Sequence, residues 1–152
     1  MWHPTRRAIH TPTAPTPPPF LSQAIVANNT VHCSGQIGVD PATGEIVQGS
    51  VQARAKQILR NLSAVLEAAG SSLDDVVKVN IFLTDMGDFG AVNEVYVGVF
   101  GGEGRVKPAR TCVAVKSLPM GTDVEIECSA VVRDGSSPSS SSSSSPRRGA
   151  KL

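Results

Sequence analysis

The longest helical repeat of the chain runs from Ser50 to Gly70 and constrains which layers the fold can contain. Apolar or small side chains recur there every three or four residues, which predicts an amphipathic helix that packs its apolar stripe on a sheet. Ser50 can cap the start of this helix, and Gly70 can end it in a left-handed conformation. The stripe consists of Val51, Ala55, Ile58, Leu59, Leu62, Val65, Leu66 and Ala69.

Strand-like segments surround this helix and outnumber the helices. Residues 22–39 predict two short strands around an Asn-Asn turn, and residues 40–45 read DPATGE, a Pro/Gly turn. Residues 88–100 predict a second helix with an apolar side formed by Phe89, Val92, Val95, Tyr96, Val99 and Phe100. Further strands are predicted at residues 76–84, 110–115 and 124–132, and another near residues 6–10. We therefore expect an α+β fold with a mixed sheet and two helices on one face.

Two helices leave the second face of such a sheet to be explained. From the alternation of the last two strands, we expect the apolar side chains to face the helices. Arg110, Cys112, Glu125 and Glu127 would then share the opposite face. Two interpretations stay open at this point. The face is either solvated and holds a salt bridge, or it is buried by another subunit and gathers its charges at a ligand.

The ends of the chain differ from this pattern. Residues 11–19, TPTAPTPPP, predict an extended segment that is neither helix nor central strand. From residue 135 the chain reads GSSPSSSSSSSPRRGAKL, which has nothing to bury. We expect residues 1–134 to form one domain, with its fold beginning near Arg6, and residues 135–152 to be a disordered serine-rich tail.

Charge and cysteine content exclude several classes of protein. Residues 1–134 hold 11 of the 14 basic and all 13 acidic residues. They therefore lack the excess of basic residues that is typical of proteins that bind nucleic acids. No apolar run reaches the roughly 18 residues of a membrane helix. The three cysteines are an odd number without CxxC spacing, which argues against a disulfide framework or a zinc site and for a reducing compartment.

Four stretches, in order and at fitting separations, resemble the Rid family of reactive-intermediate imine deaminases, also called YjgF or liver perchloric-acid-soluble proteins. They are CSGQIGVDPATGEIV, NLSAVLEAAGSSLDDVVKVNIFLTDMGDF, VNEVY and PARTCVAV followed by LP and VEIE. The resemblance covers about residues 6–132. It implies a chorismate-mutase-like homotrimer in which three bare sheet faces pack into a central barrel. Active sites would then lie in clefts between adjacent subunits, with no metal or organic cofactor.

The resemblance also implies a reaction, the hydrolysis of 2-imino acids such as 2-iminopropanoate and 2-iminobutanoate to 2-keto acids and ammonia. Arg110 matches the family's arginine for the substrate carboxylate. A guanidinium suits this role because its planar fork makes two parallel charge-assisted hydrogen bonds, whereas a lysine supplies charge without orientation. Without the resemblance, Arg110 is interpreted as a surface arginine at a strand end, because most arginines are solvated.

Five further residues are carried over from the family pattern. Glu127 matches the acidic residue that orients a water molecule, although a structural ion pair is the alternative interpretation. Cys112 matches a cysteine whose backbone groups face the ligand, and we expect no nucleophilic role for its thiol. Ser34 and Gly35 would line the cleft from the neighbouring hairpin. Asn93 of VNEVY matches a pocket residue, with a helix-surface amide as the alternative.

One position departs from the family pattern. The family usually has a tyrosine just before the SQA stretch, whereas this chain reads PPPFLSQA and offers Phe20 or Leu21 without a hydroxyl. A more apolar pocket wall would favour larger imines. The competing functions are a non-catalytic trimer that binds keto acids and, less favoured on charge, an endoribonuclease or translation inhibitor.

The chain ends in Ala150-Lys151-Leu152, a tripeptide of the same type as the peroxisomal Ser-Lys-Leu signal. We expect cytoplasmic or peroxisomal residence, with an import receptor as an additional partner. A mitochondrial address is the weaker interpretation. Arg6 and Arg7 precede any acidic residue, but the prolines that follow would break a presequence helix.

Overall fold

Six strands and two α-helices lie along residues 5–133, the part of the chain that the computed structural model describes. They are β1 Arg7–Ile9, β2 Ala24–Ala27, β3 Thr30–Cys33, α1 Val51–Ala68, β4 Val76–Leu83, α2 Phe89–Phe100, β5 Ala109–Ala114 and β6 Val124–Val131. All the predicted strands and both predicted helices are present, with ends that shift by one or two residues, except that the second strand of the hairpin ends at Cys33 and not near residue 39. The predicted tail at 135–152, with Ala150-Lys151-Leu152, lies outside the described residues.

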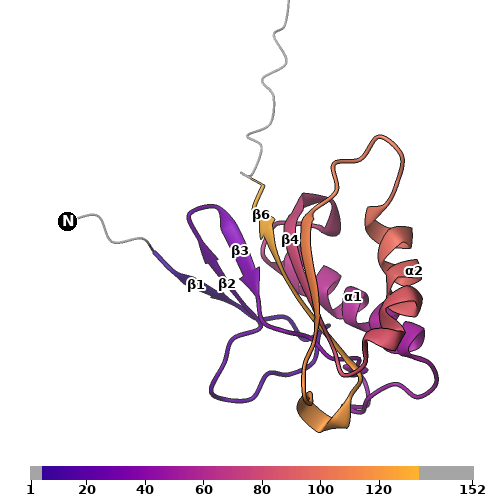
Figure 1. Cartoon of the computed structure of the whole chain (residues 1–152). Coiled ribbons are helices and arrows are strands. Elements are labelled where there is room, and N and C mark those ends of the chain that lie inside the picture. Colours follow the sequence, from indigo (N-terminus) through magenta and orange to yellow (C-terminus); the bar gives the residue numbers. More distant parts are fainter. Residues whose placement is uncertain (1–4, 134–152) are drawn as a thin grey trace, which may run out of the picture.

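The six strands form one mixed sheet in the order β1-β2-β3-β6-β4-β5 (Figure 1). Only β4 and β5 pair in parallel, and α2 provides the crossover between them. The other neighbours are antiparallel. Strands β1 and β5 are the two edges. This order places the β2–β3 hairpin and β5 on opposite sides of the central strands β6 and β4.

Local sequence explains the turns and helix ends. Asn28 and Asn29 adopt φ values of 50° and 58°, the left-handed conformation that asparagine tolerates in a tight hairpin. The Ser50 hydroxyl accepts a hydrogen bond from the Ala53 amide at 3.2 Å and caps α1. Gly70, with φ of 80°, follows the end of α1. The predicted cap and stop signals of this helix are therefore confirmed.

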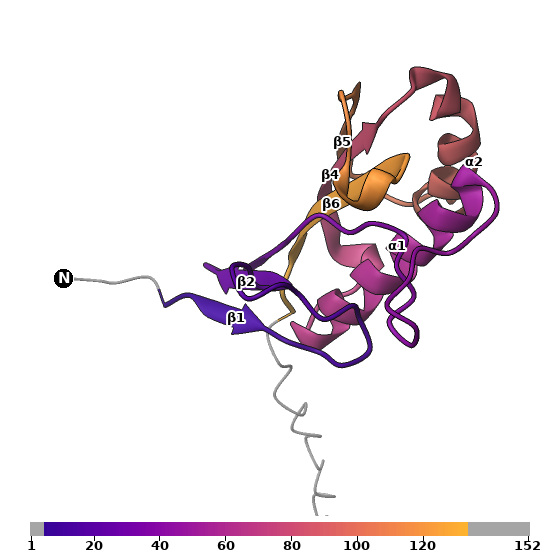
Figure 2. The same ribbon diagram turned by 90° about the horizontal axis from the view of Figure 1, so that it is seen from below.

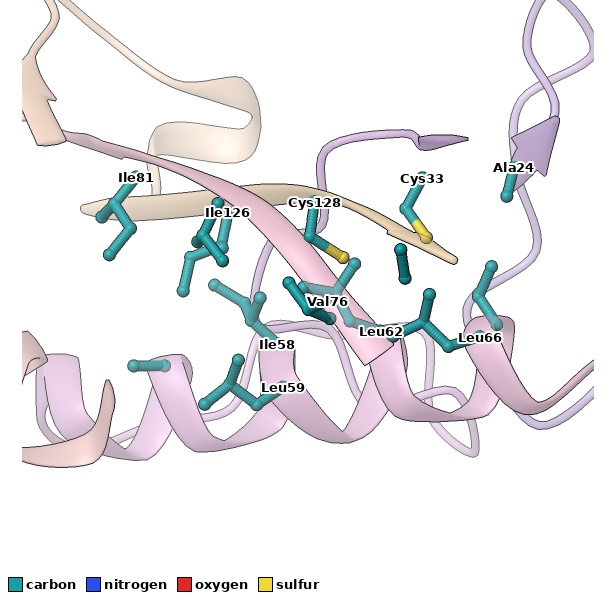
Figure 3. Close-up of a cluster of buried hydrophobic side chains, with 14 of the residues drawn as sticks. Ala24, Cys33, Ile58, Leu59, Leu62, Leu66, Val76, Ile81, Ile126 and Cys128 are labelled. Atoms are coloured by element: carbon teal, nitrogen blue, oxygen red, sulfur yellow. The ribbon is translucent and has the colours of Figure 1, made fainter. Parts of the chain in front are cut away.

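Both helices lie on the same side of the sheet (Figure 2). Figure 3 shows side chains of α1, including Ile58, Leu59, Leu62 and Leu66, packed against side chains from the strands. Their burial supplies the main stabilisation, because each fully buried aliphatic side chain contributes roughly 1.5–3 kcal/mol before the entropy of folding is counted. We call this side of the sheet the helix face and the opposite side the open face.

The proline-rich segment is held by one buried amide. The Gln23 side chain, 1% exposed, accepts a hydrogen bond from the Thr11 amide at 2.7 Å. It donates hydrogen bonds to the carbonyls of Thr11 and Pro15, each at 3.0 Å. These three contacts satisfy a buried polar group and fix the prolines beside the start of β2. The segment is neither helix nor strand, as the prolines predict.

The prediction that Arg110 shares a sheet face with Glu125 and Glu127 is wrong. Arg110 is aligned with the buried Val79 of β4, so it and Cys112 lie on the helix face. The two glutamates alternate with buried apolar residues of β6 and therefore lie on the open face. The error arose because β5 is an edge strand, where the helix face is only partly covered and can hold a charged side chain.

Polar side chains pair across the open face. Asn80 donates to Glu127 at 2.9 Å, and Lys78 donates to Thr111 at 3.0 Å. The Val113 side chain of β5, 41% exposed, points to this same face. No helix of residues 5–133 covers it (Figure 2).

Candidate active site

Arg110 on β5 lies beneath one face of α2. Its Nη1 donates a hydrogen bond of 2.7 Å to Oδ1 of Asn93. Its guanidinium carbon is 4.4 Å from the ring centre of Tyr96 and 5.5 Å from that of Phe89. The structure thus brings together two predicted site residues, Arg110 and Asn93, and adds two aromatic rings that the sequence prediction had assigned to the core.

The contacts of Arg110 leave part of its hydrogen-bonding capacity unused. Within residues 5–133, Nε and Nη2 have no hydrogen-bond partner, and no carboxylate forms an ion pair with this arginine. The Nε–H and Nη2–H groups point in the same direction along one edge of the guanidinium and form a fork for a carboxylate. The half-buried guanidinium of Arg110 is fixed at Nη1 by Asn93. Its Nε–Nη2 edge, which suits a planar carboxylate, has no partner within residues 5–133.

Cys112 lies two residues further along β5, on the same face of the sheet as Arg110. Burial raises the pKa of its thiol, and the positive charge of Arg110 opposes this shift without cancelling it. The thiol is therefore protonated at neutral pH, as a poor nucleophile would be. A protonated thiol is in line with the expectation of no nucleophilic role for Cys112, whereas the role of its backbone groups stays a prediction.

Glu125 and Gly35 form a second group on the open face. The space that a β-carbon at Gly35 would need is occupied by the carboxylate of Glu125. Burial raises the pKa of the Glu125 carboxyl, and the charge of Glu127 raises it further. A carboxyl with a raised pKa beside a bare backbone segment is suited to accept and return a proton.

The two neighbouring glutamates have different surroundings. Glu127, the residue chosen from the sequence, accepts the amide of Asn80 and is held by the sheet. Glu125 forms no side-chain hydrogen bond within residues 5–133. The sequence prediction overlooked Glu125 because strand alternation places both carboxylates on one face without revealing which one is already paired.

A pocket of about 350 Å³ adjoins Gly35. Ser34 also lines this pocket, but its hydroxyl donates to the carbonyl of Ser22 at 2.6 Å and is already engaged. Leu21 lines it too, whereas Phe20 is 83% exposed and does not. The other lining residues are mostly apolar: Pro15, Thr16, Pro17, Pro18, Gln23, Gln36, Ile37, Val39, Pro41, Gly44 and Met120. Of the two residues that could replace the tyrosine, only Leu21 therefore lines this pocket.

The predicted site residues form two separate groups in one chain. Arg110, Asn93 and Cys112 gather at the β5 edge under α2, on the helix face or above it. The second group, Ser34 and Gly35 with the two glutamates, gathers at the open face and the end of β3. Strand β4 and the thickness of the sheet separate Arg110 on β5 from the two glutamates on β6.

The described residues also limit other kinds of site. No group of three or more His, Cys, Asp or Glu side chains in residues 5–133 is placed to hold a metal ion. In the same residues, no helix combines the length and the apolar character needed to cross a membrane.

Comparisons with known proteins agree on one family. A family model described as Endoribonuclease L-PSP matches residues 11–132. A mouse protein named 2-iminobutanoate/2-iminopropanoate deaminase is 45% identical over 126 residues, which cover 83% of this chain and 91% of the mouse protein. The Schizosaccharomyces pombe protein mmf1, named as mitochondrial, is 48% identical over 130 residues, 84% of this chain and 76% of that protein.

A solved structure gives the same result for the fold. The crystal structure of E. coli TdcF with bound serine matches with a TM-score of 0.78 and 39% identity. The match covers 84% of this chain and 99% of that chain. Residues 11–132, which the family model matches, include both groups of side chains described above.

Proposed function

Because this chain belongs to the endoribonuclease L-PSP family, also known as the YjgF or Rid family, we propose that it hydrolyses 2-imino acids to 2-keto acids and ammonia. The mouse relative is named for this reaction with 2-iminobutanoate and 2-iminopropanoate. The observation that carries the proposal is the unpaired edge of Arg110, held in place by Asn93.

Arg110 binds the substrate carboxylate through Nε–H and Nη2–H. Such a bidentate, charge-assisted pair fixes the plane of the carboxylate and therefore the plane of the adjacent C=N bond. The bound serine of TdcF offers a related carboxylate in a structure of the same fold. Fixing this plane leaves the imine carbon open to a water molecule from one side.

Glu125 accepts and donates the proton in this scheme, and the charge of Glu127 raises the pKa of the Glu125 carboxyl. The carboxylate of Glu125 accepts a proton from a water molecule as the water oxygen bonds to carbon-2 of the imine, and returns it to nitrogen to give a carbinolamine. The carboxylate then takes the hydroxyl proton of the carbinolamine and passes it to nitrogen as the C=O bond forms and the C–N bond breaks, so that a keto acid and ammonia leave. We place Glu125 in the role first given to Glu127, because its carboxyl lies against Gly35 and has a raised pKa.

The complete site forms between two copies of the chain in a homotrimer. In one chain, Arg110 and Glu125 lie on opposite faces of the sheet, so neither can meet the other at one small substrate. The open face has no helix cover within residues 5–133, which suits packing against further copies. Each copy would supply Arg110 to one cleft and Glu125 with Gly35 to another.

A coupled assay tests the reaction. An amino-acid oxidase or dehydratase generates the imine, and its disappearance is followed with and without this protein. Arg110→Ala should lower kcat/KM by about 30-fold or more, because losing one partner of a buried bidentate pair costs about 2–5 kcal/mol. Arg60→Ala, an exposed arginine of α1, is the matched control and should keep full activity. An Arg110→Ala protein with full activity would refute the assignment.

Two other functions have different signatures. A protein that only binds keto acids would bind the product but would not accelerate imine loss. An endoribonuclease, the activity in the family description, would cleave RNA under the same conditions. Residues 1–134 hold 11 basic and 13 acidic residues, which disfavours binding to a polyanion.

Location stays a prediction. The tripeptide Ala150-Lys151-Leu152 predicts peroxisomal import, whereas the relative mmf1 is named as mitochondrial. An N-terminally tagged chain should form puncta with a peroxisomal marker, and deletion of Leu152 should disperse them. Signal in mitochondria, or a diffuse signal with the tail intact, would contradict the peroxisomal address.

A further inference from the structure

One side of α2 contacts the guanidinium of Arg110. Phe89, Asn93 and Tyr96 follow one another at spacings of four and three residues, so they share one side of the helix. Only Val92 and Phe100 of α2 are fully buried. Phe89 is 38% exposed and Tyr96 is half-buried. Part of the surface of these two aromatic rings, which we call the aromatic shelf, is therefore left free by the core.

The aromatic shelf contacts the guanidinium of Arg110. The guanidinium carbon lies 4.4 Å from the ring centre of Tyr96 and 5.5 Å from that of Phe89. Both distances are within the range in which the negative face of an aromatic ring attracts a cation. Burial raises the pKa of the Tyr96 hydroxyl, so this ring faces Arg110 as a neutral phenol.

The shelf and Asn93 act on different parts of the same group. The two rings hold the guanidinium by cation–π attraction, and Asn93 fixes its Nη1 end by a hydrogen bond of 2.7 Å. An unrestrained arginine side chain would lose much rotamer freedom when it binds a ligand. An arginine already held by these contacts loses less, so its free edge is preorganised for a carboxylate.

We propose that Tyr96, together with Phe89, is a positioning residue that holds the guanidinium of Arg110 ready for the substrate carboxylate. The proposal rests on the proposed role of Arg110 as the carboxylate clamp. Because the carboxylate is bound equally in the ground state and the transition state, loss of the shelf weakens binding more than turnover.

The test compares Tyr96→Leu, which removes the ring, with Tyr96→Phe, which keeps it. Tyr96 also packs on Phe100, with ring centres 4.8 Å apart, so Tyr96→Leu could disturb folding. Phe89→Leu is the second variant, since Phe89 is partly exposed and lies at the other end of the shelf. Val97→Ala, a change at a residue 51% exposed on α2, is the control for the helix itself.

Three readouts separate positioning from general stability. The first is the NMR signal of the Arg110 Nε–H group, which a nearby ring shifts. The second is the affinity for 2-oxobutanoate by calorimetry, and the third is the division of the kinetic effect between KM and kcat. Thermal unfolding of each variant is measured beside them.

We expect Tyr96→Leu to shift the Arg110 Nε–H signal and to raise both KM and the Kd of 2-oxobutanoate by about 3- to 10-fold. The kcat of Tyr96→Leu should change less than its KM. Phe89→Leu should show a smaller effect in the same direction. Tyr96→Phe, which keeps the ring, should have the KM and Kd of the parent protein. An unchanged signal and Kd in a folded Tyr96→Leu protein would overturn the proposal, as would equal losses in Tyr96→Phe. The NMR signal of Arg110 and the Kd of 2-oxobutanoate do not depend on turnover. If the deaminase assignment is wrong, the parent protein itself is inactive in the coupled assay, and this outcome is distinct from the failure of the positioning proposal.

Discussion

The guanidinium of Arg110 and the carboxylate of Glu125 lie on opposite faces of one sheet, although both residues belong to strands of the same half of the chain. Arg110 is aligned with Val79, a buried residue of β4. Glu125 is aligned with Phe82 of the same strand, whose side chain points to the other face of the sheet. A small substrate cannot contact both groups in a single chain. This separation makes assembly a requirement of the proposed chemistry.

The first prediction distinguishes the two glutamates. Glu125→Gln should lower kcat by about 100-fold or more, because it removes the group that accepts and returns a proton. Glu127→Gln should cost less than about tenfold, since the amide can still pair with Asn80. Thermal unfolding at neutral pH should show no loss of stability in Glu125→Gln, because the change removes a carboxylate that burial disfavours.

The pH profile of the same variants gives the second prediction. Activity should fall as pH decreases through the pKa of Glu125, which burial and the charge of Glu127 raise above the ordinary value of 4.5. In Glu127→Gln one of the two causes is gone, so the acid limb should move to lower pH. A limb that stays in place, or moves up, would contradict the assignment of Glu125 as the titrating base.

The third prediction concerns the missing tyrosine. Leu21→Tyr places a larger, polar side chain in the pocket beside Gly35 and should lower activity on large apolar imines relative to small ones by about tenfold. Phe20→Tyr, at a residue 83% exposed, is the control and should leave this ratio unchanged. If Leu21→Tyr alters the kinetics of neither class, the pocket does not receive the substrate side chain.

The sequence predicted the elements well because their signals are local. The apolar stripe of α1, the Asn28-Asn29 turn and the cap at Ser50 depend on residues close together in the chain, and each is present. The proline segment was correctly predicted to be irregular, but its anchor was not. Gln23 holds it through hydrogen bonds to Thr11 and Pro15, and such contacts have no periodic signal.

The site was harder to predict because faces and partners depend on the whole sheet. Alternation in β5 defines two sides but does not say which one lies under the helices, and the pairing of Val79 with Arg110 decides this. Likewise, the partner of Glu127 comes from β4, 47 residues away in sequence, so its pairing with Asn80 was not visible. The sequence could therefore indicate which residues belong to the site, but their arrangement depends on pairing between distant strands.

A fourth prediction concerns stability away from the site. Arg54 of α1 forms a two-point contact with Asp123, with Nε–Oδ1 and Nη2–Oδ2 distances of 2.6 Å. Hydrogen bonding from Arg54 lowers the pKa of Asp123 below its ordinary 3.8.

The stabilisation that this pair contributes is therefore complete above about pH 4 and is lost as pH falls through the lowered pKa. A double-mutant cycle with Arg54→Met and Asp123→Asn, measured by denaturant unfolding, should give a coupling energy of about 1–2 kcal/mol at pH 7 that declines as pH falls through the lowered pKa of Asp123. A coupling energy that rises as the pH is lowered would contradict this account of the pair.

The most direct test of the shared site mixes two inactive variants, Arg110→Ala and Glu125→Gln, in one assembly. The two chains are co-expressed with different tags, and purification over both tags isolates mixed assemblies. In each mixed trimer one of three interfaces combines an intact Arg110 with an intact Glu125, so activity per site should return to about one third of the parent value. Mixed trimers that stay as inactive as either variant alone would show that the two residues do not act at an interface between copies.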